Sequence, residues 1–247
     1  MELYKRVWMS IRKRILLKYN RRYYVKFTGK LFYLLDMRNR VDRHIDASSE
    51  YERRQLVYLF SKLKAINCNC FIDIGSHWGL YSLHFANEGC FSDAKIFAFE
   101  PDKVNRYQLY ANLFLNKMED RIRVYGYALS NRKGKARFHH FADNNRGRSG
   151  ITSEGETEVE VEELDNIVDI KGQAVGIKID VEGHEVEAIS GMSSLLKNNV
   201  CVLQVESFES QLPEVHKRLL ELGYEKINKI DSDNYYSNEK TSKLSDE

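Results

Sequence analysis

The sequence Phe71-Ile72-Asp73-Ile74-Gly75-Ser76-His77-Trp78-Gly79-Leu80-Tyr81-Ser82 decides the fold of this chain. Its short apolar run leads into two glycines, Gly75 and Gly79, at the start of a helical pattern. A second apolar run, Lys95–Phe99, ends at Glu100. A glycine-containing turn after one strand and an acidic residue at the end of the next strand are typical of an adenosine-binding crevice in an α/β sheet.

The spacing of these residues also restricts the ligand. Gly75 can adopt backbone conformations that other residues disfavour, and its missing side chain allows a ligand to lie against the main chain. Glu100 can accept hydrogen bonds from both hydroxyls of a ribose. His77 and the lack of a third close glycine do not fit a dinucleotide fingerprint, so a nicotinamide dehydrogenase fits poorly. The pattern suits a cationic, phosphate-free ligand such as S-adenosylmethionine, and the pairing with Glu100 favours this over an ordinary βα turn.

A later segment repeats the order of strand, acidic end, tight turn and helix. Its most specific part is Lys178-Ile179-Asp180-Val181-Glu182-Gly183-His184-Glu185. With this segment the chain resembles the FkbM family of S-adenosylmethionine-dependent methyltransferases, over roughly residues 51–206. The resemblance implies methyl transfer to a hydroxyl group, often on a sugar of a surface polysaccharide or on a polyketide. The segments that carry the resemblance are Phe71–Ser82, Phe97–Asp102, Ala128–Asn131 and Ala174–Glu185.

Length and composition agree with one α/β domain. Of 247 residues, 43% are apolar and 30% are charged, which predicts a folded body. The expected fold class is α/β: a doubly wound, mostly parallel seven-stranded sheet of the class I methyltransferase type, with an N-terminal helix/hairpin extension and an inserted antiparallel hairpin. We expect a basic extension over residues 1–49, a methyltransferase domain over 50–230 and a polar, disordered tail over 231–247.

Periodicity and turn residues place the individual elements. A helix over 50–65 is expected to be capped by Ser48 or Ser49. Hairpin strands are expected over 22–27 and 31–35, and the inserted antiparallel pair over 135–141 and 156–164. The remaining helices are expected over 79–88, 102–117, 184–197 and 214–222, and the remaining strands over 122–127, 200–205 and 224–230.

The N-terminal segment is strongly basic. Residues 1–44 carry 13 Lys and Arg against 3 Asp and Glu, a net charge of +10, which leaves −8 for the rest of the chain. The first residues form a basic amphipathic helix, either packed on the domain, which is slightly favoured, or in peripheral contact with an anionic membrane through residues 1–20. No recognised binding module accompanies the charge, so nucleic acid is not expected as a partner. The apolar positions of this helix are Leu3, Tyr4, Val7, Trp8, Ile11 and Ile15.

The cysteine spacing and the hydropathy of the chain predict its cellular location. The cysteines at positions 68, 70, 90 and 201 have neither disulfide-framework nor zinc spacing, and are interpreted as small core residues in a reducing compartment. No apolar run approaches the roughly 18 residues of a membrane span, and no secretory apolar stretch occurs at the N-terminus. We therefore expect a cytoplasmic protein, which the basic helix could place at the inner face of the cell membrane.

Cofactor binding is assigned to residues near the strand ends, because ligands of open α/β sheets lie beyond the carboxyl ends of the strands. Asp73 is expected to organise the turn and to face the methionine ammonium group, and Glu100 to hold the ribose. The predicted set for S-adenosylmethionine is Asp73, Gly75, Ser76, Gly79, Glu100, Pro101, Ala128 and Asp180.

A general base is expected because a sugar hydroxyl is a poor nucleophile near neutral pH. His184 has the ordinary pKa best suited to this task, while Asp180 could take the proton itself or orient a histidine. Residues 144–150 form either a mobile loop that could cover the substrate or a plain surface loop. The candidates for catalysis are Asp180, Glu182, His184, Glu206 and His77.

Metal dependence is left open and is favoured less than metal-free base catalysis. Asp180 and Glu206, with Glu182 as a third ligand, offer hard oxygen ligands suited to Mg²⁺. The predicted function is O-methylation of a sugar hydroxyl in a surface polysaccharide or glycoconjugate. The alternatives are a lipid-linked or secondary-metabolite acceptor, or a non-catalytic module that binds a membrane or partner through the basic N-terminus. The acidic residues are present at both glycine-containing turns, and a protein that had lost catalysis would not need them, which argues against the non-catalytic module.

Overall fold

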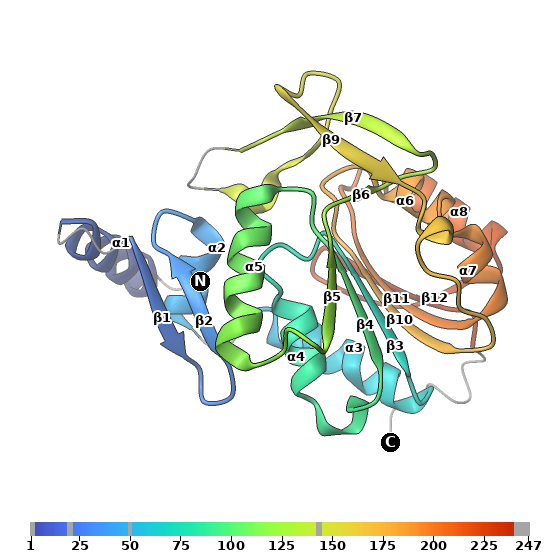
Figure 1. Ribbon diagram of the computed structural model, residues 1–247, viewed down its shortest axis with the longest axis horizontal. Helices are drawn as coiled ribbons and strands as arrows, with labels where there is room; N and C mark the ends of the chain where they lie inside the picture. Colours follow the sequence, from blue (N-terminus) through green and yellow to red (C-terminus); the bar gives the residue numbers. More distant parts are fainter. Residues whose placement is uncertain (1–2, 19–21, 49–50, 142–144, 240–247) are drawn as a thin grey trace.

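The computed structural model describes residues 3–18, 22–48, 51–141 and 145–239. Its centre is a seven-stranded sheet with the order β12-β13-β11-β10-β3-β4-β5 (Figure 1). The sheet is parallel except for β13, which runs antiparallel to both of its neighbours. This confirms the predicted fold class. The strands are β3 (Cys70–Ile74), β4 (Lys95–Phe99), β5 (Ile122–Tyr125), β10 (Ala174–Ile179), β11 (Val200–Glu206), β12 (Glu225–Ile230) and β13 (Asp233–Ser237).

The central strands are buried on both faces, which explains their almost uninterrupted apolar sequences. All five residues of β3 are buried, and alternate side chains point to opposite sides of the sheet. Phe71 enters one hydrophobic cluster and Ile72 the other. The first cluster includes side chains of α3 (Arg53–Ala65), α4 (Leu80–Asn87) and α5 (Lys103–Asn116), and the second those of α6 (Glu185–Ser190), α7 (Ser193–Asn198) and α8 (Leu212–Glu221).

Two helix boundaries differ from the prediction for identifiable reasons. The helix expected over 184–197 is divided into α6 and α7 at Gly191, where a Cβ would lie 1.9 Å from the carbonyl oxygen of Ser130. The predicted cap of α3 is also wrong. Glu52, in a left-handed conformation with φ 51°, precedes that helix and gives it no side-chain cap. Ser48 instead follows the last residue of α2 (Arg40–Ala47), and Ser49 lies outside the described residues.

A separate four-stranded sheet, in the order β6-β9-β7-β8, contains the inserted antiparallel pair. Val161 is buried while Glu158 and Glu160 are exposed, as the alternation predicts. Glu162 is an exception, because it is buried and accepts a hydrogen bond from the amide of Asn166 at 3.0 Å. The strands are β6 (Ala128–Leu129), β7 (Gly134–His139), β8 (Gly150–Ile151) and β9 (Thr157–Glu162).

The N-terminal residues form a helical and β-hairpin module beside α5 (Figure 1). The amide oxygens of Asn112 and Asn116 accept hydrogen bonds from the backbone N–H groups of Leu34 and Phe32, at 2.7 and 2.9 Å. These contacts fasten the edge of the hairpin to α5. The elements of the module are α1 (Leu3–Lys18), β1 (Tyr23–Phe27), β2 (Phe32–Asp36) and α2, of which α2 was not predicted.

The expected disordered tail from residue 231 is wrong for the described part of that segment. β13 inserts between β11 and β12, and all five of its residues are buried. Lys178 and Gln204 donate hydrogen bonds to Asp233 at 2.9 and 2.7 Å, and Lys226 donates one to Asn234 at 2.7 Å. The segment is polar, so disorder was expected from its sequence. Its hydrogen-bond partners lie on other strands, which the local sequence does not reveal. Residues 240–247 lie outside the described residues.

The cysteines were expected in the core, and no membrane-spanning helix was expected. Cys68, Cys70 and Cys201 are buried, as core residues should be, whereas Cys90 is exposed. Among the described helices, none combines the length and the apolar character that crossing a bilayer requires.

Candidate active site

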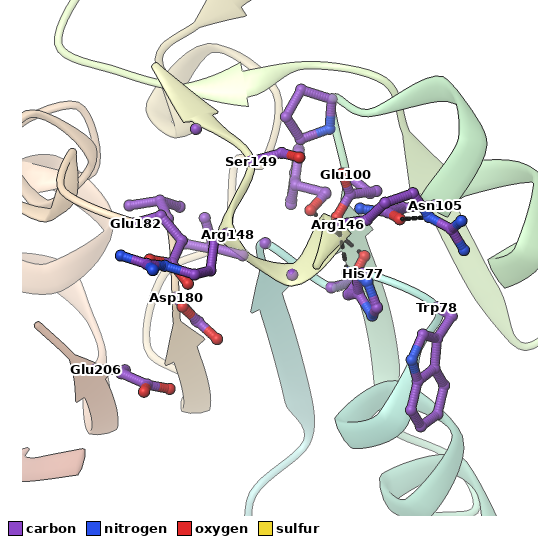
Figure 2. Close-up of a pocket in the computed structure, with 18 of the residues that line it drawn as sticks. His77, Trp78, Glu100, Asn105, Arg146, Arg148, Ser149, Asp180, Glu182 and Glu206 are labelled. Atoms are coloured by element: carbon purple, nitrogen blue, oxygen red, sulfur yellow. Dashed lines mark hydrogen bonds between the residues drawn. The ribbon is translucent and has the colours of Figure 1, made fainter. Parts of the chain in front are cut away.

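A cavity of about 350 Å³ opens at the carboxyl ends of β3, β4, β10 and β11 (Figure 2). It is lined by all five candidates for catalysis and by every residue of the predicted cofactor set except Gly79. The structure therefore brings together side chains that the sequence separates by more than a hundred positions. The roles of these residues stay predictions.

Glu100 is fixed by two backbone donors. Its Oε2 accepts a hydrogen bond from the N–H of His77 at 2.7 Å, and its Oε1 accepts one from the N–H of Asp102 at 2.8 Å. The side chain is 4% exposed, and this burial raises its pKa to about 8, against the lowering effect of the two donors. Each oxygen keeps a further lone pair, so the carboxylate fits the two hydroxyls of a ribose.

Asp73 ties the end of β3 to the first turn of α4. Its Oδ2 accepts hydrogen bonds from the backbone N–H and the hydroxyl of Ser82, at 3.0 and 2.6 Å. Burial raises the pKa of Asp73 to about 6. This geometry agrees with a role in organising the turn, while contact with a methionine ammonium group stays a prediction.

The two glycines of the turn are required by the packing of the protein itself. Gly75 has φ 77°, and a Cβ added there would lie 1.8 Å from the carbonyl oxygen of Asp180. Gly79 has φ 94°, and its added Cβ would lie 2.4 Å from the side chain of Leu109 on α5. Gly75 thus lets the ends of β3 and β10 meet. The sequence suggested that Gly75 makes room for a ligand. In the structure, the group that needs this room is the carbonyl oxygen of Asp180.

Three carboxylates face the cavity from the ends of β10 and β11 (Figure 2). Asp180 follows β10, Glu206 ends the neighbouring β11, and Glu182 lies in the turn after β10 with φ 54°. Burial raises the pKa of Asp180 well above its usual value, and the charges of Glu206 and Glu182 add to this effect. Burial and the charge of Glu206 raise the pKa of Glu182 to about 7. Asp180 and Glu182 can therefore hold protons near neutral pH.

Lys178 supplies the fixed positive charge beside these carboxylates. It lies within β10 and is 2% exposed, with its Nζ 2.9 Å from Asp233 Oδ1 and 3.5 Å from Glu206 Oε2. Burial opposes its charge, but Asp233 and Asp180 raise the pKa of Lys178 well above its usual value. Sequence reasoning missed this role. The available signal was a lysine inside an otherwise apolar buried strand, which demands a partner.

The two candidate histidines are poorly placed to act as the base. His184 Nε2 lies 3.0 Å from the hydroxyl of Ser130, and Nδ1 lies 3.5 Å from Glu187. Burial lowers the pKa of His184, and it lowers that of His77 to about 3. A lowered pKa makes a histidine a weaker base, so the structure disfavours both histidines for this role, and the identity of the base stays a prediction.

Arg146 anchors the segment that covers one side of the cavity. The residue is 4% exposed and donates hydrogen bonds to Asp36 at 2.7 Å, to Gln108 at 3.1 Å and to Asn105 at 3.3 Å. The described part of the loop expected over 144–150 is therefore fastened to β2 and α5, and Asn144 lies outside the described residues. No local signal identifies this contact, since the partners come from distant elements. Further lining residues that sequence reasoning missed are Arg40, His44, Tyr51, Glu52 and Arg148.

Within the described residues, no group of three or more His, Cys, Asp or Glu side chains is placed to hold a metal ion. The ammonium group of Lys178 lies beside Glu206, so a metal there would compete with a fixed cation. Mg²⁺ dependence stays a prediction, with Asp180 and Glu206 as the ligands that this chain could supply.

The model of the methyltransferase FkbM domain matches residues 73–226, which is more than half of the chain. The chain belongs to the FkbM methyltransferase family. This match includes the glycine-containing turn, Glu100 and the three carboxylates of the cavity. The family's fold implies binding of S-adenosylmethionine, and the lone pairs of Glu100 fit its ribose.

A solved structure of an FkbM methyltransferase agrees on the fold. The FkbM methyltransferase from Methylobacillus flagellatus is 16% identical with a TM-score of 0.51, and the match covers 69% of this chain and 44% of that one. This chain thus corresponds to less than half of that protein. An S-adenosylmethionine-dependent O-methyltransferase from Thermotoga maritima is 12% identical with a TM-score of 0.49, covering 74% of this chain and 64% of that one. No curated protein matches the sequence.

The raised pKa of Glu100 predicts that cofactor affinity depends on pH. Ribose hydroxyls donate to the carboxylate, so the FkbM protein should bind S-adenosylhomocysteine in the form that has lost the Glu100 proton. Affinity should be highest above pH 8 and should weaken as pH falls, by up to about tenfold per unit between pH 8 and pH 6. Calorimetry across this range measures the effect. Glu100→Gln should bind more weakly and show a flat profile, whereas a flat profile in the wild type would contradict the assignment.

Proposed function

We propose that this FkbM-family protein is an S-adenosylmethionine-dependent O-methyltransferase that methylates a hydroxyl of a carbohydrate, in a surface polysaccharide or glycoconjugate. The observation that carries the proposal is that Glu100 and three carboxylates at the ends of β10 and β11 line one cavity. Carboxylate oxygens accept hydrogen bonds, and a sugar presents several hydroxyl donors. The cavity thus offers the acceptors that a polyol needs, beside the place for the cofactor.

The chain contributes mainly alignment. Glu100 and the turn of Gly75 and Ser76 would hold the cofactor, which supplies a methyl group activated by a sulfonium when bound. The carbonyl oxygen of Asp180 abuts Gly75, and its N–H donates to Ile74 at 3.0 Å. Of the three acids at the ends of β10 and β11, Asp180 is therefore the one whose backbone abuts the cofactor turn. Holding the acceptor hydroxyl against it fixes the orientation on which this chemistry depends.

A carboxylate of this cluster would accept the proton of the acceptor hydroxyl. A general base works best with a pKa near the working pH, and burial brings the pKa of Glu182 to about 7 and raises that of Asp180. Because the base must have lost its proton, turnover should fall as the pH is lowered, below about pH 7 where Glu182 is the base. His184, bonded to Ser130, positions the turn after β10 and does not take the proton.

A lipid-linked acceptor is the second candidate. It is supported by the exposed apolar face of α1, which is described in the next subsection. The chemistry at the hydroxyl would be the same, so the two acceptors differ only in what they carry outside the cavity.

Transfer of a labelled methyl group tests the proposal. The protein is incubated with tritiated S-adenosylmethionine and with free oligosaccharides, lipid-linked oligosaccharides, phenols or amines. We expect label in carbohydrate, recovered as an O-methyl sugar by mass spectrometry, and less label by about 10²-fold or more with Asp180→Asn. Label found only on phenols or on nitrogen would reject a carbohydrate acceptor, and label restricted to the lipid-linked samples would select the second candidate.

A further inference from the structure

The first helix presents its apolar face to solvent. Five large apolar side chains at helical spacing share one stripe, with exposures between 44% and 64%. The slightly favoured expectation was a helix packed on the domain with its basic face in solvent; α1 does pack on α2, but these apolar side chains are exposed. We call this surface the α1 stripe, and it consists of Tyr4, Val7, Trp8, Ile11 and Ile15.

The other side of α1 attaches it to the protein through charged groups. Arg12 pairs with Asp46 of α2 at 2.7 Å, and its guanidinium lies over the ring of Tyr24. Lys13 is partly buried, and its pKa is lowered by burial and by Arg43. A surface helix of a soluble domain normally buries its apolar side and exposes its charges. On α1, by contrast, the apolar stripe is exposed while Arg12 and Lys13 are partly buried, so the α1 stripe is available to a surface outside the domain.

Exposed apolar side chains are concentrated in this part of the molecule. Of the seventeen large apolar side chains that are exposed in the described residues, nine lie before residue 33. Besides the α1 stripe they include the hairpin residues Phe27 and Phe32, whose ring centroids lie 4.7 Å apart. Patches of this kind on a soluble protein mark an interaction surface.

The charge of the same segment identifies the kind of partner. Residues 1–44 carry a net charge of +10, while the rest of the chain carries −8. Arg14 and Lys18 are exposed on α1 itself. An apolar stripe flanked by basic residues matches an anionic lipid surface, where the apolar side chains enter the acyl boundary and the basic groups meet the headgroups.

We propose that α1 is an interfacial anchor that holds this protein on anionic membranes through the α1 stripe. α1 packs on α2, and Arg40, Val41 and His44 of α2 line the cavity. Docking through α1 therefore places the active site one helix away from the bilayer. The inference goes beyond the proposed function and does not rest on the identity of the acceptor.

Tryptophan fluorescence and flotation test the anchor with the full chain. The protein has two tryptophans: Trp8 is 44% exposed in the stripe, and Trp78 is 1% exposed in the core. Vesicles of phosphatidylglycerol and phosphatidylcholine should shift the emission to shorter wavelength. Trp8→Phe should abolish the emission shift, while the protein still binds the vesicles in the flotation assay. Binding should increase with the anionic lipid fraction and weaken at high salt.

A charge placed in the stripe gives the decisive comparison. Ile11→Glu should lower vesicle partitioning at least tenfold, because it buries a carboxylate at an anionic surface. The matched control is Val57→Glu on α3, where the side chain is 62% exposed away from the stripe, and it should partition like the wild type. Both variants should bind S-adenosylhomocysteine as the wild type does, which shows that they fold.

Three results would overturn the proposal. The first is equal partitioning of Ile11→Glu and the wild type, and the second is binding that ignores the anionic lipid fraction. The third is a dimer in lipid-free buffer that Ile11→Glu dissociates, which would make a second copy of the chain the occupant of the stripe.

Discussion

Asp180→Asn is expected to lower methyl-transfer turnover by about 10²-fold or more while the affinity for S-adenosylhomocysteine changes only a few-fold. The substitution keeps the size of the side chain and removes its ability to take a proton. Asp180 abuts the cofactor turn through its backbone and shares the cavity with Glu182 and Glu206. Single-turnover kinetics and calorimetry on the same variant separate the two effects.

Variants of the neighbouring residues control for this result. Glu206→Gln and Glu182→Gln should lower turnover less than Asp180→Asn, because the backbone of Asp180 abuts Gly75 of the turn. His184→Ala should also have a smaller effect, since its imidazole contacts Ser130 and Glu187 rather than Asp180. Full turnover in Asp180→Asn with the true acceptor would remove Asp180 from catalysis. If chelation abolishes wild-type activity and Mg²⁺ restores it, a metal acts in place of the free carboxylate.

Gly75→Ala is expected to destabilise the fold by about 3 kcal/mol or more, which corresponds to a fall in Tm of roughly 6–12 °C for a chain of this size. The reason is a collision of backbone with side chain, because the new Cβ would lie 1.8 Å from the carbonyl oxygen of Asp180. To relieve it, the ends of β3 and β10 must separate, so cofactor affinity should fall as well. Thermal unfolding and calorimetry measure the two losses.

Gly223→Ala is the matched control for this variant. Gly223 has φ 85°, close to the 77° of Gly75, but a Cβ there would meet nothing within 4 Å. It should therefore lose only about 1 kcal/mol, the cost of the left-handed backbone. Gly75→Ala with wild-type stability and weakened cofactor binding would instead support the ligand contact inferred from the sequence.

The sequence by itself determined which segments form the strands of the parallel core and that acidic residues end several of them. Apolar runs that end in an acid or a glycine are local signals, and short βα connections leave few topologies open. Glu100 at the end of β4 and Asp180 at the end of β10 could therefore be assigned to one edge of the sheet. The inserted pair of β7 and β9 was equally visible, because alternating side chains report on a half-exposed strand.

Only the tertiary structure decided the features that depend on distant partners. β13 is polar and yet buried, because Lys178, Gln204 and Lys226 from other strands satisfy its side chains. Arg146 closes one side of the cavity by donating hydrogen bonds to residues of β2 and α5. The sequence of its own loop does not predict these bonds.

The direction in which α1 faces was decided in the same way. Its sequence shows that one side is apolar and the other is basic. The pairing of Arg12 with Asp46, 34 positions later, holds Arg12 against the protein and leaves the apolar stripe exposed. Helical periodicity reports which residues share a face, and only the packing partner determines whether that face is covered or exposed.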